Sequence, residues 1–192
     1  MSPIKTSAAH EVIRKLEENS DYLSENWSLP KEAAKFLYIL IRSSECQRLL
    51  EVGTSVGYSG LHLGLAACEN GGALDTIDAS PERQNQAIQN FKEAGLSETI
   101  TPLSGDACAV LGQLADAGKR YDFIFLDAQK AQYIEYFRYA ERLLTEGGLL
   151  LADNTRSHRS EMGDFIDAIT QSPAWDCADM DTPNGFILAR KK

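Results

Sequence analysis

The chain has 192 residues, 43% of them hydrophobic and 24% charged, so it is long enough to bury the core of one domain and is not expected to be disordered. Its formal charge of −9 makes it a poor candidate for coating nucleic acid or an anionic membrane surface. Residues 1–27 carry charge throughout and hold no apolar run suited to a signal peptide or a membrane span, so a cytoplasmic protein is expected.

The N-terminal part of the chain predicts helices and then a buried strand. Apolar residues at helical spacing within Ala8–Trp27 predict an amphipathic helix or a pair of helices, acting as a packing or dimerisation arm. Pro30 fits the first turn of a further helix over Lys31–Arg42. The strand Arg48–Gly53 then runs into a glycine-rich turn, and Leu61–Ala67 continues as a helix.

The rest of the chain alternates strands with helices. Strands are expected over Ala73–Asp78, Ile100–Ser104, Tyr121–Asp127, Leu149–Asn154, Trp175–Met180 and Gly185–Ala189, and helices over Pro81–Ala94, up to about Ala117, over Tyr133–Leu144 and over Glu161–Thr170. Successive strand-then-helix units predict a Rossmann-like, doubly wound α/β fold with a mostly parallel seven-stranded sheet and helices on both faces. The turn 181–184 is too short to join parallel strands, so one antiparallel edge strand is expected. No linker divides the chain, which predicts a single domain with residues 1–29 as a helical arm.

The glycine-rich turn has the composition of a ligand-binding turn. Its spacing, Gly53-x3-Gly57-x2-Gly60, differs from the G-x-G-x-x-G that holds a dinucleotide pyrophosphate. The difference favours a nucleotide-like ligand with a carboxylate and no pyrophosphate, against the alternative of a purely structural turn. Asp78 ends the next strand, 25 residues after Gly53, where an acidic residue can accept from both hydroxyls of a ribose. The alternative for Asp78 is a solvated loop acid.

Two readings stay open for the acid that follows the third strand. Asp106 could accept from an adenine amino group, with the backbone N–H of Ala107 directed at the ring. Asp106 could equally be the N-cap of a helix, bonding the amide of Ala109.

Polar side chains also end the fourth and fifth strands. Asp127 ends one, and Asp153 with Asn154 ends the other, so three oxygen ligands converge if the strands are neighbours. Such a set suits Mg²⁺, with Ca²⁺ or Mn²⁺ as alternatives, whereas two unrelated aspartates are the structural alternative. Lys130 lies on the loop after Asp127, where it could deprotonate an acidic hydroxyl or simply be solvated. His158, in the next loop, is more often a bystander than a base at such a position.

Three stretches that contain these residues resemble the cation-dependent class I O-methyltransferases, the family of catechol and caffeoyl-CoA O-methyltransferases and their bacterial relatives. The stretches are Glu51–Ser59, Phe125–Lys130 and Ala152–Asn154. The resemblance extends from about Pro30 to Arg190. The chain departs from the family at Ala34-Lys35, where members often carry Gly-Gln.

The resemblance implies a methyltransferase domain that binds S-adenosylmethionine. It places the methionine end of the cofactor at Glu51, Gly53 and Ser59, the ribose at Asp78 and the adenine at Asp106 and Ala107. The full cofactor set that it implies is Glu51, Gly53, Thr54, Ser59, Asp78, Ala79, Asp106, Ala107 and Asp127. It further implies that Asp127, Asp153 and Asn154 bind the metal, that Lys130 and Asp127 act in catalysis, and that the protein is a homodimer.

The leading hypothesis is methyl transfer to a hydroxyl of a small molecule, which we expect to be catechol-like or a vicinal diol. No nucleic-acid or membrane partner is expected. One alternative is an NAD(P)-dependent oxidoreductase, which the glycine spacing and the lack of a Tyr-x-x-x-Lys element oppose. A second alternative is a non-catalytic module that binds S-adenosylmethionine.

Overall fold

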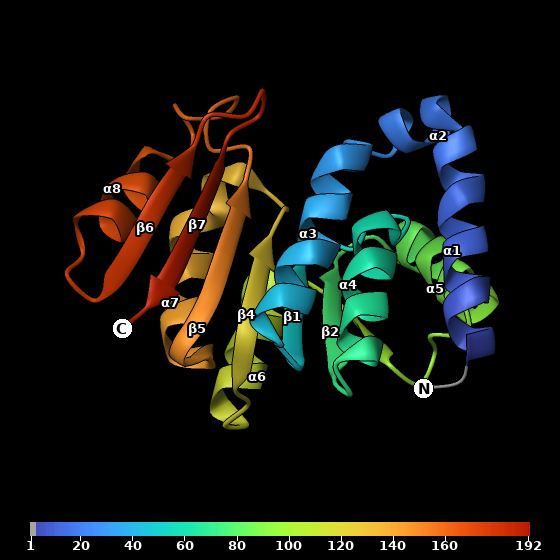
Figure 1. Cartoon of the computed structure of the whole chain (residues 1–192). Coiled ribbons are helices and arrows are strands. Elements are labelled where there is room, and N and C mark those ends of the chain that lie inside the picture. The colour runs from blue at the N-terminus through green and yellow to red at the C-terminus, as the bar shows by residue number, and fades with distance from the viewer. Residues whose placement is uncertain (1–2) are drawn as a thin grey trace. The chain divides into compact units, whose positions relative to one another are not determined.

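The computed structural model describes residues 3–192, with side chains from Thr6 onward. The helices are α1 Pro3–Glu18, α2 Ser20–Glu25, α3 Lys31–Ser44, α4 Tyr58–Glu69, α5 Pro81–Glu93, α6 Ala107–Asp116, the short 3₁₀ helix η1 Lys130–Gln132, α7 Tyr133–Leu143 and α8 Gly163–Gln171. The strands are β1 Arg48–Val52, β2 Ala73–Asp78, β3 Ile100–Ser104, β4 Tyr121–Leu126, β5 Leu144–Asp153, β6 Trp175–Met180 and β7 Phe186–Lys191 (Figure 1). Each expected element is therefore present, and Ala8–Trp27 contains parts of two helices.

The strands of residues 3–192 form one seven-stranded sheet in the order β3-β2-β1-β4-β5-β7-β6. β2 pairs with β3 and β4 with β5 in parallel, while β7 runs antiparallel to both β5 and β6. The expected fold class, a mostly parallel Rossmann-like sheet with antiparallel pairing at one end, is confirmed. The antiparallel strand β7 lies one place in from the end, because β6 pairs with its outer side.

Contacts divide the described residues into two compact units. Unit 1 comprises the chain up to Leu49 together with Thr54–Gly105, and unit 2 comprises Leu50–Gly53 together with Asp106–Lys192. The chain passes from one unit to the other within β1, after Gly53 and after Gly105. The expectation of a single domain stays a prediction.

Unit 1 is organised around α4. Every residue from Tyr58 to Ala67 is buried, because α1, α3 and α5 pack on this helix and it lies on β2. Ala9, Val12 and Ile13 form the buried face of α1. Although α4 is apolar, neither it nor any other helix within residues 3–192 is long and apolar enough to cross a membrane.

Unit 2 is built on the buried strands β4 and β5. Rings of α7, α8 and β6 pack together beside them, with Phe137 contacting both Phe165 and Trp175 at centroid distances of 5.7 and 5.4 Å. β5 begins five residues earlier than the sequence predicts, at Leu144, which pairs with Tyr121 ahead of an irregularity in the pairing of β4 with β5. Gly147, with a φ of 77°, lies in this irregular stretch.

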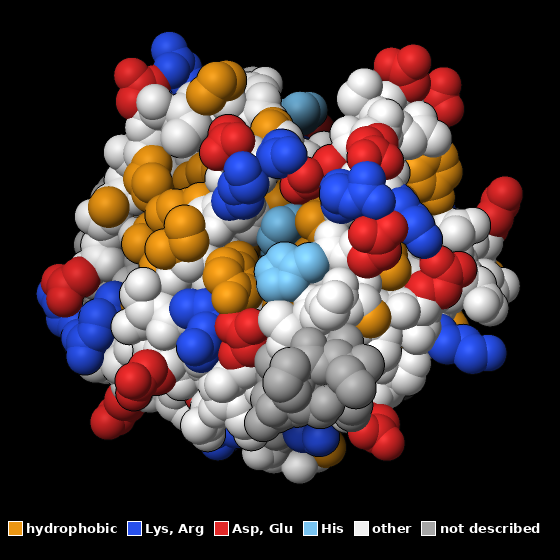
Figure 2. Space-filling view, turned by 45° about the vertical axis from the view of Figure 1, so that its right-hand side comes forward, with side chains coloured by type: hydrophobic (Ala, Val, Ile, Leu, Met, Phe, Trp, Pro, Cys, Tyr) orange, Lys and Arg blue, Asp and Glu red, His pale blue; other side chains and the backbone are white. Residues whose placement is uncertain are grey.

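The surface carries both signs of charge. On the face in Figure 2, basic and acidic side chains lie close together, with small apolar areas between them. Many of the charges are paired along helices, as for Arg138 with Glu135 at 2.5 Å on α7. Exposed pairs of this kind contribute little to stability because water and salt screen them.

Candidate active site

The glycine turn follows β1 and leads into α4. Gly53 has a φ of 109°, and a Cβ added there would lie 2.1 Å from the backbone oxygen of Asp127. The amide of Asp127 donates to Val52 O at 2.9 Å, so the end of β1 lies against the backbone that follows β4. At Gly57, a Cβ would lie 2.7 Å from the ring of Phe91. Close packing therefore accounts for both glycines. This is the structural alternative that the sequence left open for the turn.

In unit 1, hydrogen bonds hold the residues around the end of β2 in place. Asp78 accepts from two backbone amides, of Ser55 at 2.7 Å and of Ser80 at 2.8 Å. Thr54 and Thr76 share a buried hydroxyl–hydroxyl bond of 2.6 Å. The Asp78 carboxylate is thus fixed in orientation, and each of its oxygens retains a free lone pair that a hydroxyl could use. Sequence analysis missed Ser55, because its contribution is a backbone amide.

Several other predicted cofactor contacts lie at the ends of elements. Ser59 is in the first turn of α4 and is 8% exposed, while Glu51 in β1 is fully buried. Ala79 follows Asp78 directly in unit 1. In unit 2, Asp106 caps α6, since its Oδ1 accepts from the amide of Ala109 at 3.0 Å, and Ala107 is the first residue of that helix. Asp106 is thus the N-cap of α6, which was one of the two predicted roles, and its Oδ2 takes no part in the cap.

Unit 2 gathers the charged residues that follow β4. Lys130 Nζ donates to Asp127 Oδ1 at 2.8 Å, and both side chains are about one-sixth exposed, at 16% and 15%. Burial raises the pKa of Asp127, while Lys130 and, more weakly, His158 oppose this rise. Lys130 is therefore paired beside Asp127, not solvated on the loop.

Asp153 ends β5 next to the same cluster. Because Leu126 is paired with Ala152 in the parallel register, Asp127, directly after β4, and Asp153, the last residue of β5, lie at the same end of neighbouring strands. Asp153 is 2% exposed, and its Oδ1 has no hydrogen-bond partner among residues 3–192. Burial raises the pKa of Asp153 to about 7, the charge of Asp127 adds to the rise, and the amide of Asn154 lowers it. The expected approach of the two carboxylates is present.

The donor set at this point consists of two carboxylates and one amide. No group of three or more His, Cys, Asp or Glu side chains within the described part of the chain is arranged to hold a metal. The predicted third ligand is Asn154, an amide outside those four residue types, and its backbone is left-handed with a φ of 66°. Two close carboxylates, one with an unsatisfied buried oxygen, fit a hard cation in charge and in ligand type.

His158 lies in the loop that follows Asn154. The amides of Arg156 and Ser157 both donate to Asn184 O, at 2.9 and 3.0 Å, and the amide of His158 donates to Asn154 O at 3.0 Å. His158 Nδ1 is 3.0 Å from Ser157 Oγ. The loop is thus attached to the turn before β7.

Tyr133 is a residue of this region that sequence analysis named only as the start of an expected helix. It is fully buried, its hydroxyl donates to Leu126 O at 3.0 Å, and Lys130 Nζ lies 5.7 Å from its ring centroid. Burial raises the pKa of Tyr133, and the charges of Asp127 and Asp153 raise it further. The sequence signal was one of several aromatic residues at the start of a helix, which does not reveal a partner.

Comparison with known proteins gives a consistent set of relatives. A protein-family model described as O-methyltransferase matches residues 4–166. A catechol O-methyltransferase of Niastella koreensis is 37% identical over 66% of this chain and 58% of its own length. A flavonoid 3',5'-methyltransferase of Vitis vinifera is 30% identical over 84% of this chain and 75% of its own length. The crystal structure of an O-methyltransferase from Bacillus cereus in complex with SAH superposes with a TM-score of 0.85 at 26% identity, covering 97% of this chain and 91% of that one.

Proposed function

The chain belongs to the O-methyltransferase family, and we propose that it transfers a methyl group from S-adenosylmethionine to a hydroxyl oxygen of a small molecule with the assistance of a divalent cation. The observation that carries the proposal is the cluster after β4 and β5, where Asp127 pairs with Lys130 and the buried Oδ1 of Asp153 has no partner among residues 3–192. A structural role alone gives no reason to keep such an oxygen unsatisfied.

Cofactor binding is assigned to the predicted set described above. In unit 1, Asp78 would accept from the ribose hydroxyls, because backbone amides already fix its carboxylate. Ser59, in the first turn of α4, would donate to the carboxylate of the methionine end, where the helix N-terminus favours negative charge. The SAH complex of the Bacillus cereus relative supports this class of cofactor.

Asp127, Asp153 and Asn154 would hold the cation, with Mg²⁺ favoured by their oxygen ligands. When bound, the ion would lower the pKa of an acceptor hydroxyl and favour its ionised form. A pair of adjacent hydroxyls is the acceptor chemistry that we propose, and the catechol O-methyltransferase relative supports this choice.

Lys130 would act on the acceptor oxygen, either by stabilising the negative charge that develops there or as a base. One N–H of its ammonium group donates to Asp127, which leaves two donors for an acceptor oxygen. The buried Tyr133 beneath it restricts where the ammonium group can lie. As an ammonium group, Lys130 would thus orient the acceptor oxygen and offset its negative charge, whereas only its neutral amine form would take the proton of the acceptor. A homodimer and a cytoplasmic location stay predictions.

The test is an acceptor screen monitored by release of S-adenosylhomocysteine. Catechol, an aliphatic vicinal diol and phenol are compared with Mg²⁺, with excess EDTA, and with Mg²⁺ restored after EDTA. We expect turnover of catechol with Mg²⁺, loss in EDTA, recovery on restoring Mg²⁺, and little turnover of phenol, which has a single oxygen.

Each alternative predicts another outcome. Full activity in excess EDTA would refute the role of the cation. Binding of S-adenosylhomocysteine without turnover of any acceptor would favour a non-catalytic module. Tight NADH binding, detected by its fluorescence, would favour an oxidoreductase.

A further inference from the structure

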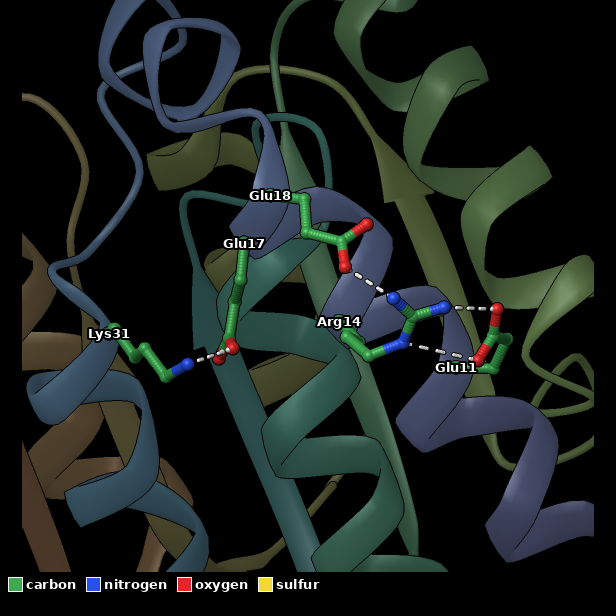
Figure 3. A network of polar contacts seen from close by, with 5 residues as sticks. All are labelled: Glu11, Arg14, Glu17, Glu18 and Lys31. Carbon is green, nitrogen blue, oxygen red and sulfur yellow. Dashed lines mark hydrogen bonds and ion pairs between the residues drawn. The ribbon is translucent and has the colours of Figure 1, made fainter.

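A buried polar cluster in unit 1 joins α1 to the start of α4. Tyr58 Oη, from the first residue of α4, donates to Glu17 Oε1 at 3.1 Å. Lys31 Nζ, from the first residue of α3, lies 2.5 Å from the other oxygen, Glu17 Oε2. Figure 3 shows the Glu17 carboxylate extending from α1 toward Lys31, while Arg14 lies between Glu11 and Glu18. One carboxylate therefore connects three helices of this unit.

Burial distinguishes Glu17 from the other charges of α1. The side chain of Glu17 is 13% exposed, and Tyr58 is 1% exposed. By contrast, Arg14 and its two partners are each about half exposed, so water screens their ion pairs. Glu17 continues the face of α1 that buries Ile13, four residues earlier. The Glu17 contacts should consequently hold the helix far more firmly than the Arg14 contacts do.

His62 adds a second unusual feature to the cluster. It lies one turn after Tyr58 on α4, with the two rings edge to face at 5.1 Å. The ring is 6% exposed, and its Nε2 has no hydrogen-bond partner among the described residues. Burial lowers the pKa of His62 to about 4, the Glu17 carboxylate opposes this shift, and His10, Lys35 and Lys31 reinforce it. The interior beneath α1 thus contains a neutral histidine, and Lys31 is the cation in contact with Glu17.

Tyr58 connects this cluster to the glycine turn. It directly follows Gly57, which is the N-cap of α4, has a φ of 85° and provides no side chain to cap the helix. The amides of the first turn of α4 therefore lack a side-chain cap. Ser59, the next residue, is the proposed contact of the cofactor carboxylate. A movement of Tyr58 would move this turn as well.

We propose that Glu17 is a positioning residue for cofactor binding, which acts through Tyr58 and Lys31 to dock α1 and to hold the first turn of α4. This inference rests on the proposed function. Because the same first turn takes part in both events, docking of α1 and binding of the cofactor favour each other. The amphipathic N-terminal arm accordingly has a part in binding S-adenosylmethionine.

The test compares Glu17→Gln and Tyr58→Phe with Arg14→Gln, a control on the exposed side of the same helix. Calorimetry gives the dissociation constant of S-adenosylhomocysteine, and hydrogen exchange of the α1 amides, with and without this ligand, reports docking. We expect each of the first two variants to bind roughly 5- to 20-fold more weakly. The double variant should weaken binding by less than the product of the two single factors, because both substitutions act on the same Glu17 contacts and are therefore coupled. Arg14→Gln should bind as the wild type does, and the ligand should protect α1 in it.

The result that would overturn the inference is wild-type affinity in both Glu17→Gln and Tyr58→Phe. Tyr58→Phe keeps the buried ring, so it remains informative if Glu17→Gln does not fold. Wild-type protein that fails to bind S-adenosylhomocysteine would refute the proposed function itself. The two failures are distinguishable, because only the second appears in the unmodified chain.

Discussion

Two aspartates that end strands, Asp78 in unit 1 and Asp153 in unit 2, have opposite environments. Both oxygens of Asp78 accept backbone amides, of Ser55 and Ser80. Asp153 is buried with an oxygen that has no partner among residues 3–192, and burial together with the charge of Asp127 raises its pKa to about 7. Asp78 is satisfied before any ligand arrives, whereas Asp153 is destabilising until a proton or a cation reaches it.

The difference indicates what each position is suited to do. A carboxylate fixed by amides keeps one geometry and can discriminate between ligands by the positions of their hydroxyls. A crowded pair of carboxylates instead favours positive charge, since a cation relieves both their repulsion and their loss of hydration. The predictions below test this contrast, beginning with the largest expected effect.

Replacing Asp153 by alanine should abolish most activity. In Asp153→Ala, kcat/KM for catechol with Mg²⁺ should fall by at least about 100-fold, because several kcal/mol of charge stabilisation depend on the cation site. Calorimetry should show loss of Mg²⁺ binding and retention of S-adenosylhomocysteine binding. The matched control is Asp179→Ala on β6, an exposed aspartate 3.5 Å from Arg159, which should behave as the wild type. Wild-type activity of Asp153→Ala would show that Asp153 does not hold a catalytic cation, and would remove the functional contrast with Asp78.

Replacing Gly53 by alanine should destabilise the fold where β1 meets the backbone of Asp127. The added Cβ would lie 2.1 Å from Asp127 O at a φ of 109°, so the unfolding free energy should fall by about 2–4 kcal/mol. Gly71 is the matched control, with a φ of 76° and no atom within 4 Å of an added Cβ. Gly71→Ala should cost only about 1 kcal/mol, from backbone strain alone. Equal losses in urea unfolding would show that the close approach has no energetic weight.

The pH dependence of stability should have opposite signs at His62 and Asp153. The folded pKa of His62 is lowered to about 4, so its contribution is lost as pH falls from 6.5 toward 4. The folded pKa of Asp153 is raised from 3.8 to about 7, so stability is lost as pH rises through that interval. In metal-free buffer, the unfolding free energy of Asp153→Asn relative to the wild type should be about 1–2 kcal/mol higher at pH 7.5 than at pH 4.5. The unfolding free energy of His62→Gln relative to the wild type should be higher by a similar amount at pH 4.5 than at pH 7.5.

Denaturant titrations across this range measure both effects. Curves that stay parallel to the wild type would show that neither group titrates abnormally. Addition of Mg²⁺ should remove the advantage of Asp153→Asn, because the wild-type carboxylate then has a cation.

The smallest effect is expected at Tyr133. Tyr133→Phe removes the bond to Leu126 O and keeps the ring beside Lys130, so kcat should fall by about 3- to 10-fold at nearly constant KM. Tyr139→Phe on the same helix is the control and should have no effect. A change in KM alone would indicate that Tyr133 serves substrate binding, not the placement of Lys130.

Much of the architecture followed from local pattern. The bounds of β2, β3 and β6 were predicted to the residue. In β2 and β3, apolar and β-branched residues are followed by turn residues. The family expected from the three motifs is confirmed by the family model and the relatives. Parallel pairing of β4 with β5 also made the approach of Asp127 and Asp153 predictable, because strand ends are where such residues meet.

Features that depend on distant parts of the chain escaped prediction. Glu17 and Tyr58 are 41 residues apart in the sequence, and neither residue type indicates a partner at that separation. In the sheet, β7 lies between β5 and β6. The short turn before β7 predicted its antiparallel direction but not this order of strands. The pairing of Leu144 with Tyr121 likewise depends on an irregularity that no local signal reveals.

The order of strands bears on how the protein can associate with itself. The sheet ends at β3 and at β6. Pro102 in β3 has no amide to donate to a further strand, and β6 exposes Asp176 and Asp179, which would repel their counterparts in a second copy. Both margins therefore oppose continuation of the sheet into another molecule and protect the chain from aggregation by strand pairing. A homodimer of this protein should accordingly be formed by helices.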